Sequence, residues 1–301
     1  MPTRPILITG ASGQLGHALA AHAARTGIPA RAVGRPGFDF DAPETIAATF
    51  GAADPALVVN AAAWTAVDAA ETSADAAFRA NRDGPAALAA LCRAHGIPLI
   101  HVSTDYVFDG SKGAPYTETD PIAPLGVYGE SKAAGEAAVL ASGVDALILR
   151  TAWVFSATGR NFARTMIAAA RRLPALRVVA DQRGAPTAAE DLAEAILAIA
   201  SRILAAGWQP GFAGIFHATS AGDTSWHGFA TEILAIAARH GTPRPDIVPI
   251  ATADWPTPAR RPADSRLDCT KLRQTFGLAL PHWRDATSRI VPALIAQGDA
   301  P

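Results

Sequence analysis

The chain has 301 residues, of which 50% are hydrophobic and 18% are charged, and its formal net charge at pH 7 is −1. This composition is that of a folded globular protein rather than a disordered one, and the length allows one elaborate domain or two. Basic residues form no block longer than doublets such as Arg171-Arg172, so we expect no nucleic-acid partner and no membrane partner.

Cysteine usage and hydropathy predict a soluble, cytoplasmic protein. Cys92 and Cys269 are too few for a disulfide framework and lack metal-ligand spacing. The apolar run near the N-terminus is too short for a signal peptide, and the chain has no run of about 20 apolar residues that would predict a membrane span. The eight histidines show no H-x-H or H-x-x-x-H grouping, so we expect no histidine metal site.

In the first half of the chain, short apolar runs alternate with alanine-rich stretches. The runs are apolar at successive positions and bounded by Gly, Pro or Asp, as buried parallel strands are. We predict strands at 5–10, 29–34, 56–64, 98–108 and 145–155, and helices at 14–26, 43–51, 72–95 and 129–142. This alternation predicts an α/β fold with a doubly wound parallel sheet of the Rossmann type.

After residue 155 the alternation is less regular. We predict helices at 161–172, 188–206 and 225–240, strands at 176–181 and 214–220, and an extended proline-rich segment at 254–268. The change predicts a dinucleotide-binding domain at 1–150 and a smaller, mainly substrate-binding region at 151–301. We expect the chain to return to the first domain around 175–200.

A glycine-rich loop follows the first predicted strand in "ILITGASGQLGHAL", which contains Gly10, Gly13 and Gly16. Such glycines permit a tight turn, a close approach of the backbone to a pyrophosphate, and close helix–strand packing. The loop therefore predicts dinucleotide binding. Its G-x-x-G-x-x-G spacing resembles that of the short-chain dehydrogenase/reductase superfamily, in the extended branch that handles nucleotide sugars.

The end of the second predicted strand bears on the choice between NADP and NAD. NAD-binding sites usually carry an acidic residue about 20 positions after the loop, bonded to the ribose. Here the strand ends in "AVGRP", and Arg35 offers a planar guanidinium to a 2′-phosphate. We expect NADPH as the cofactor, with some tolerance of NADH; the alternative for Arg35 is a solvent-facing loop residue.

"VYGESKAAGE" (127–136) contains Tyr128 and Lys132, one of three tyrosines and one of three lysines in the chain. At i and i+4 on a helix, the two side chains project from one face. An ammonium beside the phenol is expected to lower the pKa of Tyr128 from near 10 toward the working range. The pair is therefore predicted to be catalytic.

A hydroxyl group is also needed to hold the substrate carbonyl. Ser103 and Thr104 end a predicted strand at its carboxyl side, where open parallel sheets bind ligands. Neighbours on a strand point to opposite faces, so only one of the two can line the site. Resemblance to the superfamily favours Thr104, and we predict Thr104, Tyr128 and Lys132 as the catalytic set.

Further motifs make the resemblance specific. Six segments are similar, in order, to motifs of the dTDP-4-dehydrorhamnose reductases: "NAAAWTAVDAAE" (60–71), "STDYVFDG" (103–110), "YGESKAAGE" (128–136), "RTAWVF" (150–155), "DQRGAPT" (181–187) and "PTPARRPADSRLD" (256–268). The resemblance implies reduction of the 4-keto group of a dTDP-6-deoxy-L-hexulose to dTDP-L-rhamnose, on the route to a rhamnose-containing surface glycan.

The same resemblance implies roles for particular positions. Tyr128 would donate the proton, Lys132 would support Tyr128 and the cofactor ribose, and Thr104 would bond the keto oxygen. The implied cofactor contacts are Gly10, Gly13, Gln14, Leu15, Gly16, Arg35, Asp39, Phe40, Ala62, Ala63, Thr65, Tyr128 and Lys132. The implied contacts of the dTDP-sugar are Thr104, Asp105, Tyr106, Trp153, Arg261 and Arg266, although Trp153 has an alternative as a core residue.

The chain departs from the family pattern at one point. Some members bind a divalent cation at a dimer interface through carboxylates, one of them two positions after the third loop glycine. This chain has Ala18 there, after His17, and Glu190 alone is a poor Mg²⁺ ligand set. We expect no required metal and leave formation of a homodimer open.

Two other functions have to be weighed. A nucleotide-sugar epimerase or dehydratase of the same superfamily would retain NAD, and Arg35 argues against it, as does Tyr106 where a second acid would follow Asp105. A non-catalytic NADP-binding regulatory subunit would show changes in the hydroxyl, Tyr and Lys set, and this sequence shows none.

Overall fold

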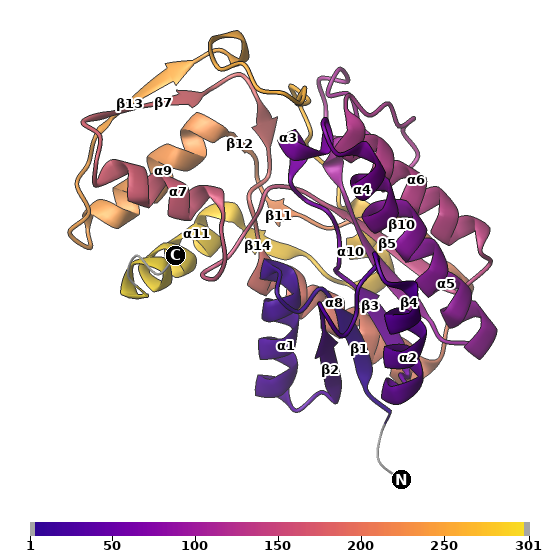
Figure 1. Ribbon diagram of the computed structural model, residues 1–301. Helices are drawn as coiled ribbons and strands as arrows, with labels where there is room; N and C mark the ends of the chain where they lie inside the picture. The colour runs from indigo at the N-terminus through magenta and orange to yellow at the C-terminus, as the bar shows by residue number, and fades with distance from the viewer. Residues whose placement is uncertain (1–3, 298–301) are drawn as a thin grey trace.

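The computed structural model describes residues 4–297, and its centre is a six-stranded parallel sheet (Figure 1). The strands lie in the order β10-β5-β4-β3-β1-β2. Their bounds are β1 Ile6–Thr9, β2 Ala30–Val33, β3 Leu57–Asn60, β4 Leu99–Thr104, β5 Ala146–Thr151 and β10 Gly214–His217. Each neighbouring pair runs parallel, so the predicted doubly wound α/β fold is confirmed.

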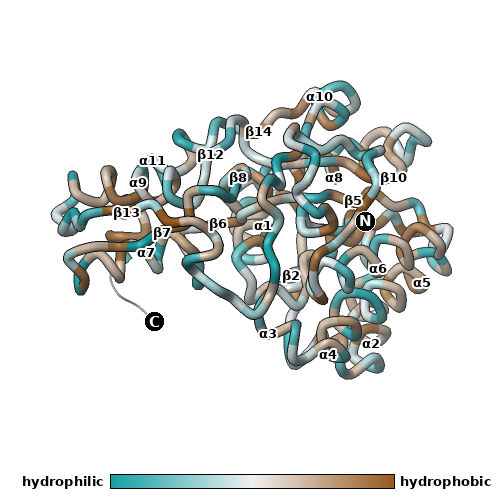
Figure 2. Tube along the Cα trace, turned by 90° about the horizontal axis from the view of Figure 1, so that it is seen from above, coloured by the Kyte–Doolittle hydropathy of each residue, from teal (hydrophilic) through white to brown (hydrophobic). Residues whose placement is uncertain are grey.

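Helices cover both faces of this sheet, which explains why its strands are apolar at successive positions. One face packs on α1 Gln14–Thr26 and α8 Ala189–Ala206, and the other on α2 Pro43–Ala53, α5 Gly84–His95 and α6 Val127–Ala141. In β1, Ile6 and Ile8 join the first core and Leu7 joins the second. Figure 2 shows the apolar colouring concentrated along inner strands such as β5.

The helix between β3 and β4 differs from the single helix predicted at 72–95. It consists of α4 Ala74–Phe78, the π-helical turn η1 Arg79–Asp83, and α5. A π turn accommodates one extra residue, and here it directs Asn81 inward. Asn81 accepts from Trp64 N at 2.8 Å and donates to Trp64 O and Ser131 Oγ, so the irregular turn ties α5 to α6 and to the segment after β3.

The remaining elements form a smaller second lobe, at the upper left of Figure 1. Its helices α7 Phe162–Ala170, α9 Trp226–Ala238 and α11 Trp283–Ala296 share one core, beside the parallel pair β7 Ala175–Val179 and β13 Asp246–Ile250. Short pairs join β6 Val154–Phe155 with β9 Thr187–Ala188, β8 Arg183–Gly184 with β12 Thr224–Ser225, and β11 Ser220–Ala221 with β14 Leu280–His282. The other short elements are α3 Val67–Ala70, α10 Thr270–Phe276, η2 Asp105–Val107, η3 Pro210–Phe212 and η4 Thr252–Asp254.

The elements that the sequence did not predict include β13, α10, β14 and α11. The longest of them, α11, carries Pro292 in its interior, a residue that usually predicts a helix end. Its apolar face packs against α9 through residues such as Trp283 and Ile290, so tertiary contact stabilises a helix that local propensity does not favour.

The chain passes between the two lobes more than once. After β7 it returns to the central sheet with α8 and β10, over residues 189–217, a return that overlaps the expected 175–200 window and extends past it. Residues 255–266 then run as an irregular strap, as the proline content predicted, and Ser265 N donates to Arg183 O at 2.9 Å. Within residues 4–297, the helices are too short or too polar to cross a lipid bilayer.

Candidate active site

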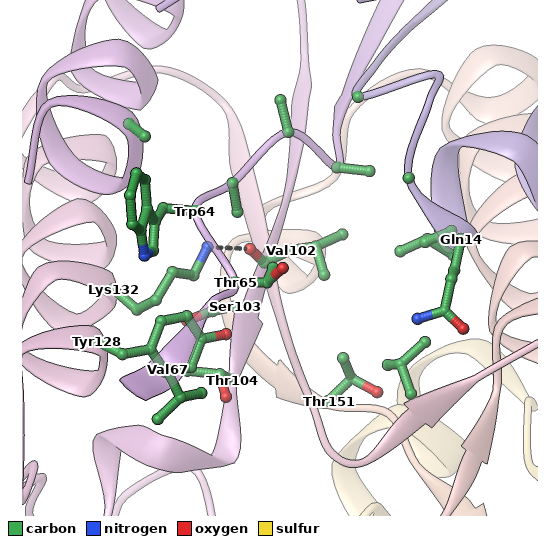
Figure 3. Close-up of a pocket in the computed structure, with 18 of the residues that line it drawn as sticks. Gln14, Trp64, Thr65, Val67, Val102, Ser103, Thr104, Tyr128, Lys132 and Thr151 are labelled. Carbon is green, nitrogen blue, oxygen red and sulfur yellow. Dashed lines mark hydrogen bonds between the residues drawn. The ribbon is translucent and has the colours of Figure 1, made fainter. Parts of the chain in front are cut away.

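A cavity of about 540 Å³ opens where the carboxyl ends of β1, β3, β4 and β5 meet the second lobe. This edge is where open parallel sheets bind ligands. Figure 3 shows Tyr128 and Lys132, both from α6, on one side of the cavity and Gln14, from the start of α1, on the other. The cavity therefore lies between the glycine loop and the predicted catalytic helix.

The glycine loop has no room for side chains. Gly10 has a φ of 75°, and a Cβ on it would lie 2.8 Å from the backbone of Ala61 and Ala62. A Cβ on Gly16 would lie 2.0 Å from Gly10 O, so α1 packs directly on the turn. Three predicted neighbours, Gly13, Gln14 and Leu15, line the cavity with Gly10, whereas Gly16 does not. The N-terminus of α1, which lacks a side-chain cap, thus faces space that fits a pyrophosphate.

A buried network holds the segment after β3 in place. Thr9 Oγ1 donates to Asn60 Oδ1 at 2.6 Å, and Ala62 N donates to both oxygens at 3.2 Å. Asn60 Nδ2 lies 2.9 Å from His101 Nδ1, and burial keeps the pKa of His101 well below its ordinary value. The supported segment supplies the predicted cofactor contacts Ala62, Ala63 and Thr65, all of which line the cavity.

Three more predicted cofactor contacts, Arg35, Asp39 and Phe40, line the cavity beyond the end of β2. The ring of Phe40 packs over Gly84, where a Cβ would lie 2.2 Å from it. Asp41 beside them pairs with Arg79 at 2.9 Å. Within the described part of the chain, Arg35 forms no ion pair, so its guanidinium is free to bind a phosphate.

Helix α6 brings Tyr128 and Lys132 to the cavity. Lys132 is 2% exposed, and its Nζ donates to Val102 O at 2.7 Å, the dashed line in Figure 3. Burial lowers the pKa of Lys132 to about 8, against an opposing effect of Glu136. Contrary to the sequence expectation, burial raises the pKa of Tyr128 to about 12, and a hydrogen bond with Thr104 offsets only part of this. The phenol is therefore neutral and can donate a proton.

The two hydroxyls that end β4 point in different directions. Ser103 Oγ donates to Glu136 Oε1 at 2.5 Å, and Arg150 donates to the same carboxylate at 2.9 and 2.6 Å. This buried network anchors α6 to β4 and β5. Both residues line the cavity, contrary to the expectation that only one would, but it is Thr104 that lies beside Tyr128 in Figure 3. The arrangement supports Thr104 as the hydroxyl that holds a substrate carbonyl.

Asp105 and Tyr106 border the same cavity. The Tyr106 ring meets the Tyr128 ring edge-on, with centroids 5.5 Å apart. Asp105 is 2% exposed; its Oδ1 accepts from Thr104 Oγ1 at 3.1 Å, and its Oδ2 has no hydrogen-bond partner among residues 4–297. Burial raises the pKa of Asp105 to about 6, so this carboxyl group keeps its proton to a higher pH than an ordinary aspartate, and burial also raises the pKa of Tyr106, which stays neutral.

A stacked pair of tryptophans forms the second-lobe wall of the cavity. Trp153 and Trp226 lie with ring centroids 3.6 Å apart and planes 7° apart, and both line the cavity. Trp153 has a φ of 48°, a strained value for a tryptophan, and Gly184 leaves room for its ring. Trp226 Nε1 donates to Gln182 Oε1 at 3.2 Å. Trp153 is thus a wall residue rather than a core residue.

The predicted substrate arginines of the strap lie outside the cavity lining. Arg261 pairs with Asp68 at 2.8 Å, and Arg266 pairs with Asp264 at 2.6 Å. The lining instead contains Arg160, which the sequence analysis did not select. In this geometry Arg261 ties the strap to α3 through Asp68. It also hydrogen-bonds Tyr106, which borders the cavity, but Arg261 itself does not line the cavity.

Comparison with known proteins places this geometry in a family. The family model described as "RmlD substrate binding domain" matches residues 4–295. A dTDP-4-dehydrorhamnose reductase of Sinorhizobium fredii is 44% identical over 97% of this chain and 98% of the relative, and one of Burkholderia thailandensis is 47% identical over 97% and 99%. This chain belongs to the dTDP-4-dehydrorhamnose reductase family. The resemblance drawn from the sequence motifs is confirmed.

Solved structures of the reductase family agree. A dTDP-4-dehydrorhamnose reductase of Clostridium acetobutylicum superposes with a TM-score of 0.88 at 34% identity, covering 97% of this chain and 99% of that one. One of Bacillus anthracis, in complex with NADP, superposes with a TM-score of 0.87 at 30% identity, covering 96% and 98%. The expected NADP-type cofactor is therefore the one bound by a structural relative.

Position 18, where the family resemblance implied a metal ligand in some members, is apolar in this chain. Ala18 is buried in the core between α1 and α8. Glu190 Oε1 accepts from Ser156 Oγ at 2.7 Å and from Ala157 N at 3.1 Å, so that oxygen is engaged within the chain. Among residues 4–297, no three acidic, histidine or cysteine side chains gather in a metal-binding arrangement.

Several lining residues escaped the sequence analysis. Trp64 and Val67 lie within a motif quoted for the family, so proximity to Thr65 was a usable signal. Arg160 and Asn161 follow a strand end, which is a weaker signal. No pattern in the sequence pointed to Trp226, because only the packing of α9 against Trp153 brings it to the cavity.

Proposed function

We propose that this chain reduces the 4-keto group of dTDP-4-dehydro-6-deoxy-L-mannose (dTDP-4-dehydrorhamnose) to give dTDP-L-rhamnose, with NADPH as reductant and NADH as a weaker substitute. Family membership over nearly the whole chain supports the activity. The observation that carries it is the meeting of Thr104, Tyr128 and Lys132 in one cavity with the glycine loop. When bound, the nicotinamide supplies a hydride.

The residues of the chain supply the proton and the orientation. Tyr128, kept neutral by burial, donates its phenolic proton to the oxygen that becomes the new hydroxyl. The phenolate that remains is stabilised by the ammonium of Lys132, one helical turn away. Thr104 donates a hydrogen bond to the same oxygen, and the Lys132 ammonium also suits a ribose hydroxyl of the cofactor.

The remaining contacts follow from the shape of the cavity. Arg35 is proposed to bind the 2′-phosphate that distinguishes NADPH, because it lines the cavity without an internal partner among the described residues. Trp153 and Tyr106 are proposed to flank the sugar ring. A cytoplasmic location belongs to the same proposal. The oligomeric state is open, and size-exclusion chromatography with light scattering measures it.

Replacing the proton donor tests the function directly. Tyr128→Phe keeps the ring and its packing but removes the acid, so kcat for NADPH oxidation with the dTDP-4-keto sugar should fall by about 10²- to 10⁴-fold. The measurement is nicotinamide absorbance against time with purified protein. Tyr116→Phe is the matched control and should retain activity, because Tyr116 is the one tyrosine of the three that does not line the cavity.

Two results would contradict the proposal. Unchanged turnover in Tyr128→Phe would remove the phenol from the chemistry. Purified protein that carries stoichiometric NAD and oxidises no NADPH would favour an epimerase or dehydratase of the same superfamily.

A further inference from the structure

The hydroxyl of Thr104 can donate only one hydrogen bond, but more than one acceptor lies close enough to receive it. A threonine hydroxyl carries one hydrogen and two lone pairs. Tyr106 N donates to Oγ1 at 3.2 Å and so occupies one lone pair. The single hydrogen is contested between Asp105 Oδ1 at 3.1 Å and the phenol of Tyr128. A substrate keto oxygen needs that same hydrogen.

The charge of Asp105 decides this competition. An ionised carboxylate only accepts, and a charge-assisted hydrogen bond to it is about twice as strong as a neutral one. An ionised Asp105 would therefore retain the Thr104 hydrogen and leave none for the substrate. A protonated Asp105 can donate to the second lone pair of Thr104 instead.

The surroundings of Asp105 shift its carboxyl group toward the protonated form. The side chain is 2% exposed, and Oδ2 lacks a hydrogen-bond partner among residues 4–297. A buried carboxylate with an unsatisfied oxygen is costly, whereas a neutral carboxyl group needs less solvation.

We propose that Asp105 acts as a protonated carboxyl that donates a hydrogen bond to Thr104 Oγ1 and thereby frees the Thr104 hydroxyl hydrogen for the keto oxygen. Asp105 is then a positioning residue that works through Thr104. Its proton stays on the carboxyl group throughout, so the proton consumed in the reduction still comes from Tyr128. The role in turnover rests on the proposed reductase function.

The titratable groups around Asp105 agree with this assignment. Tyr106 on η2 and Tyr128 on α6 face it, and in the strap Arg261 contacts Tyr106. A hydrogen bond from Ser265, also in the strap, lowers the pKa of Asp105 and so offsets part of the effect of burial. No cation among the described residues holds the pKa of Asp105 down, and burial raises it to about 6.

A spectroscopic titration tests the protonation state without any turnover. Infrared difference spectra of wild type minus Asp105→Asn should show a protonated-carboxyl band that disappears as the pH rises through a midpoint about two units above the ordinary value for aspartate. The band should be absent from the difference spectrum of the control Asp83→Asn, whose exposed carboxylate pairs with Arg82. A difference spectrum showing only carboxylate above pH 5 would overturn the proposal even if the enzyme is an active reductase.

Kinetics then test the link through Thr104. Between pH 6 and pH 7.5, kcat of the wild type should fall about tenfold as Asp105 ionises, whereas Asp105→Asn should change less than about twofold, whatever its absolute rate. The ionisation of Lys132, with a pKa of about 8, lies above this range and should remain in both proteins. Asp83→Asn should keep the wild-type profile.

A double-mutant cycle separates positioning from a general structural effect. In a Thr104→Val background, Asp105→Asn should leave the pH profile unchanged, because the hydroxyl through which Asp105 acts is gone. Thr104→Ser, which keeps the hydroxyl, should show the same fall of kcat between pH 6 and pH 7.5 as the wild type. Two outcomes would overturn the proposal. One is a change in the pH profile when Asp105→Asn is added to Thr104→Val, and the other is a wild-type fall of kcat between pH 6 and pH 7.5 in Asp105→Asn alone. Thermal melting of each variant shows whether it is folded. Absence of any NADPH oxidation by the wild type would refute the reductase function, and the infrared spectra would still determine whether Asp105 is protonated.

Discussion

At the scale of single residues, burial moves every shifted group of the site toward its neutral form. Desolvation raises the pKa of Tyr128 and Asp105 and lowers that of Lys132. A reductase that must deliver a proton to a keto oxygen benefits from a neutral phenol, so the direction of the Tyr128 shift suits reduction. The i, i+4 spacing identified the pair but not this direction, because the spacing contains no information on solvent exclusion.

Arg35 gives the residue-scale prediction. Arg35→Leu removes the proposed partner of the 2′-phosphate, so KM for NADPH should rise about 10- to 30-fold while KM for NADH changes less than about twofold, as expected for one charge-assisted hydrogen-bond site. The measurement is initial rate against concentration of each cofactor. Arg31→Leu in β2, the strand that precedes Arg35, is the control, since Arg31 bonds Ala52 O away from the cavity. Equal losses for both cofactors would remove Arg35 from the choice between them.

At the scale of elements, the site depends on how α1 and α6 are fixed to the sheet. The turn at Gly10 and Gly16 lets α1 approach β1 without a side chain between them. The Ser103–Glu136–Arg150 network fixes α6 in the same way from the other side. Both attachments depend on close contact, which is why the phosphate-facing and proton-donating ends of the two helices reach a common cavity.

The glycine turn gives the element-scale prediction. Gly16→Ala would place a Cβ 2.0 Å from Gly10 O. We expect it to destabilise the protein by about 1–3 kcal/mol through overpacking and to weaken NADPH binding. Urea unfolding and fluorescence titration of NADPH measure the two effects.

A second glycine provides the matched control. Gly51 lies inside α2, and nothing approaches its added Cβ within 4 Å. Gly51→Ala should therefore stabilise the protein by about 0.5–1 kcal/mol and leave NADPH binding unchanged. If Gly16→Ala behaved like Gly51→Ala, the close packing of α1 on the turn would not be needed.

At the scale of the whole molecule, two buried histidines make stability depend on pH. His101 lies beneath the cofactor side of the cavity, and His217 ends β10 at the edge of the sheet, with its Nδ1 3.0 Å from Tyr116 O. Burial lowers the pKa of both, that of His217 to about 3. Between a pH of about 6.5 and a pH of about 3, the unfolded chain therefore binds more protons than the folded one.

The whole-molecule prediction follows from that difference. Stability should be highest above a pH of about 6.5 and fall as the pH is lowered, by up to about 1.4 kcal/mol per pH unit for each histidine. Urea unfolding at pH 7, 6 and 5 measures the slope. His217→Gln, which retains a donor for Tyr116 O, should reduce the slope, and the exposed His240→Gln should not. An unchanged slope in His217→Gln would show that His217 is not held neutral in the folded protein.

Much of the central fold was predictable because its signals are local. Buried strands such as β1, β3 and β5 are continuous apolar runs, and α1 begins and ends at glycines, so its predicted range, 14–26, matches the structure. The second lobe was harder, because β13 is half exposed and α11 contains a proline. Those elements form through contacts with distant residues rather than through their own composition.

The sequence by itself determined the parallel sheet, the glycine loop and the family, since each depends on residue type and short-range spacing, and it is also the source of the proposed catalytic set Thr104, Tyr128 and Lys132. Only the tertiary structure decided that Trp226 joins Trp153 in the cavity wall, that Arg261 is paired with Asp68, and that burial keeps Tyr128 neutral and raises the pKa of Asp105. The physical reason is the same in each case. Desolvation and contact depend on segments that are far apart in the chain, and their arrangement is set by packing rather than by local pattern.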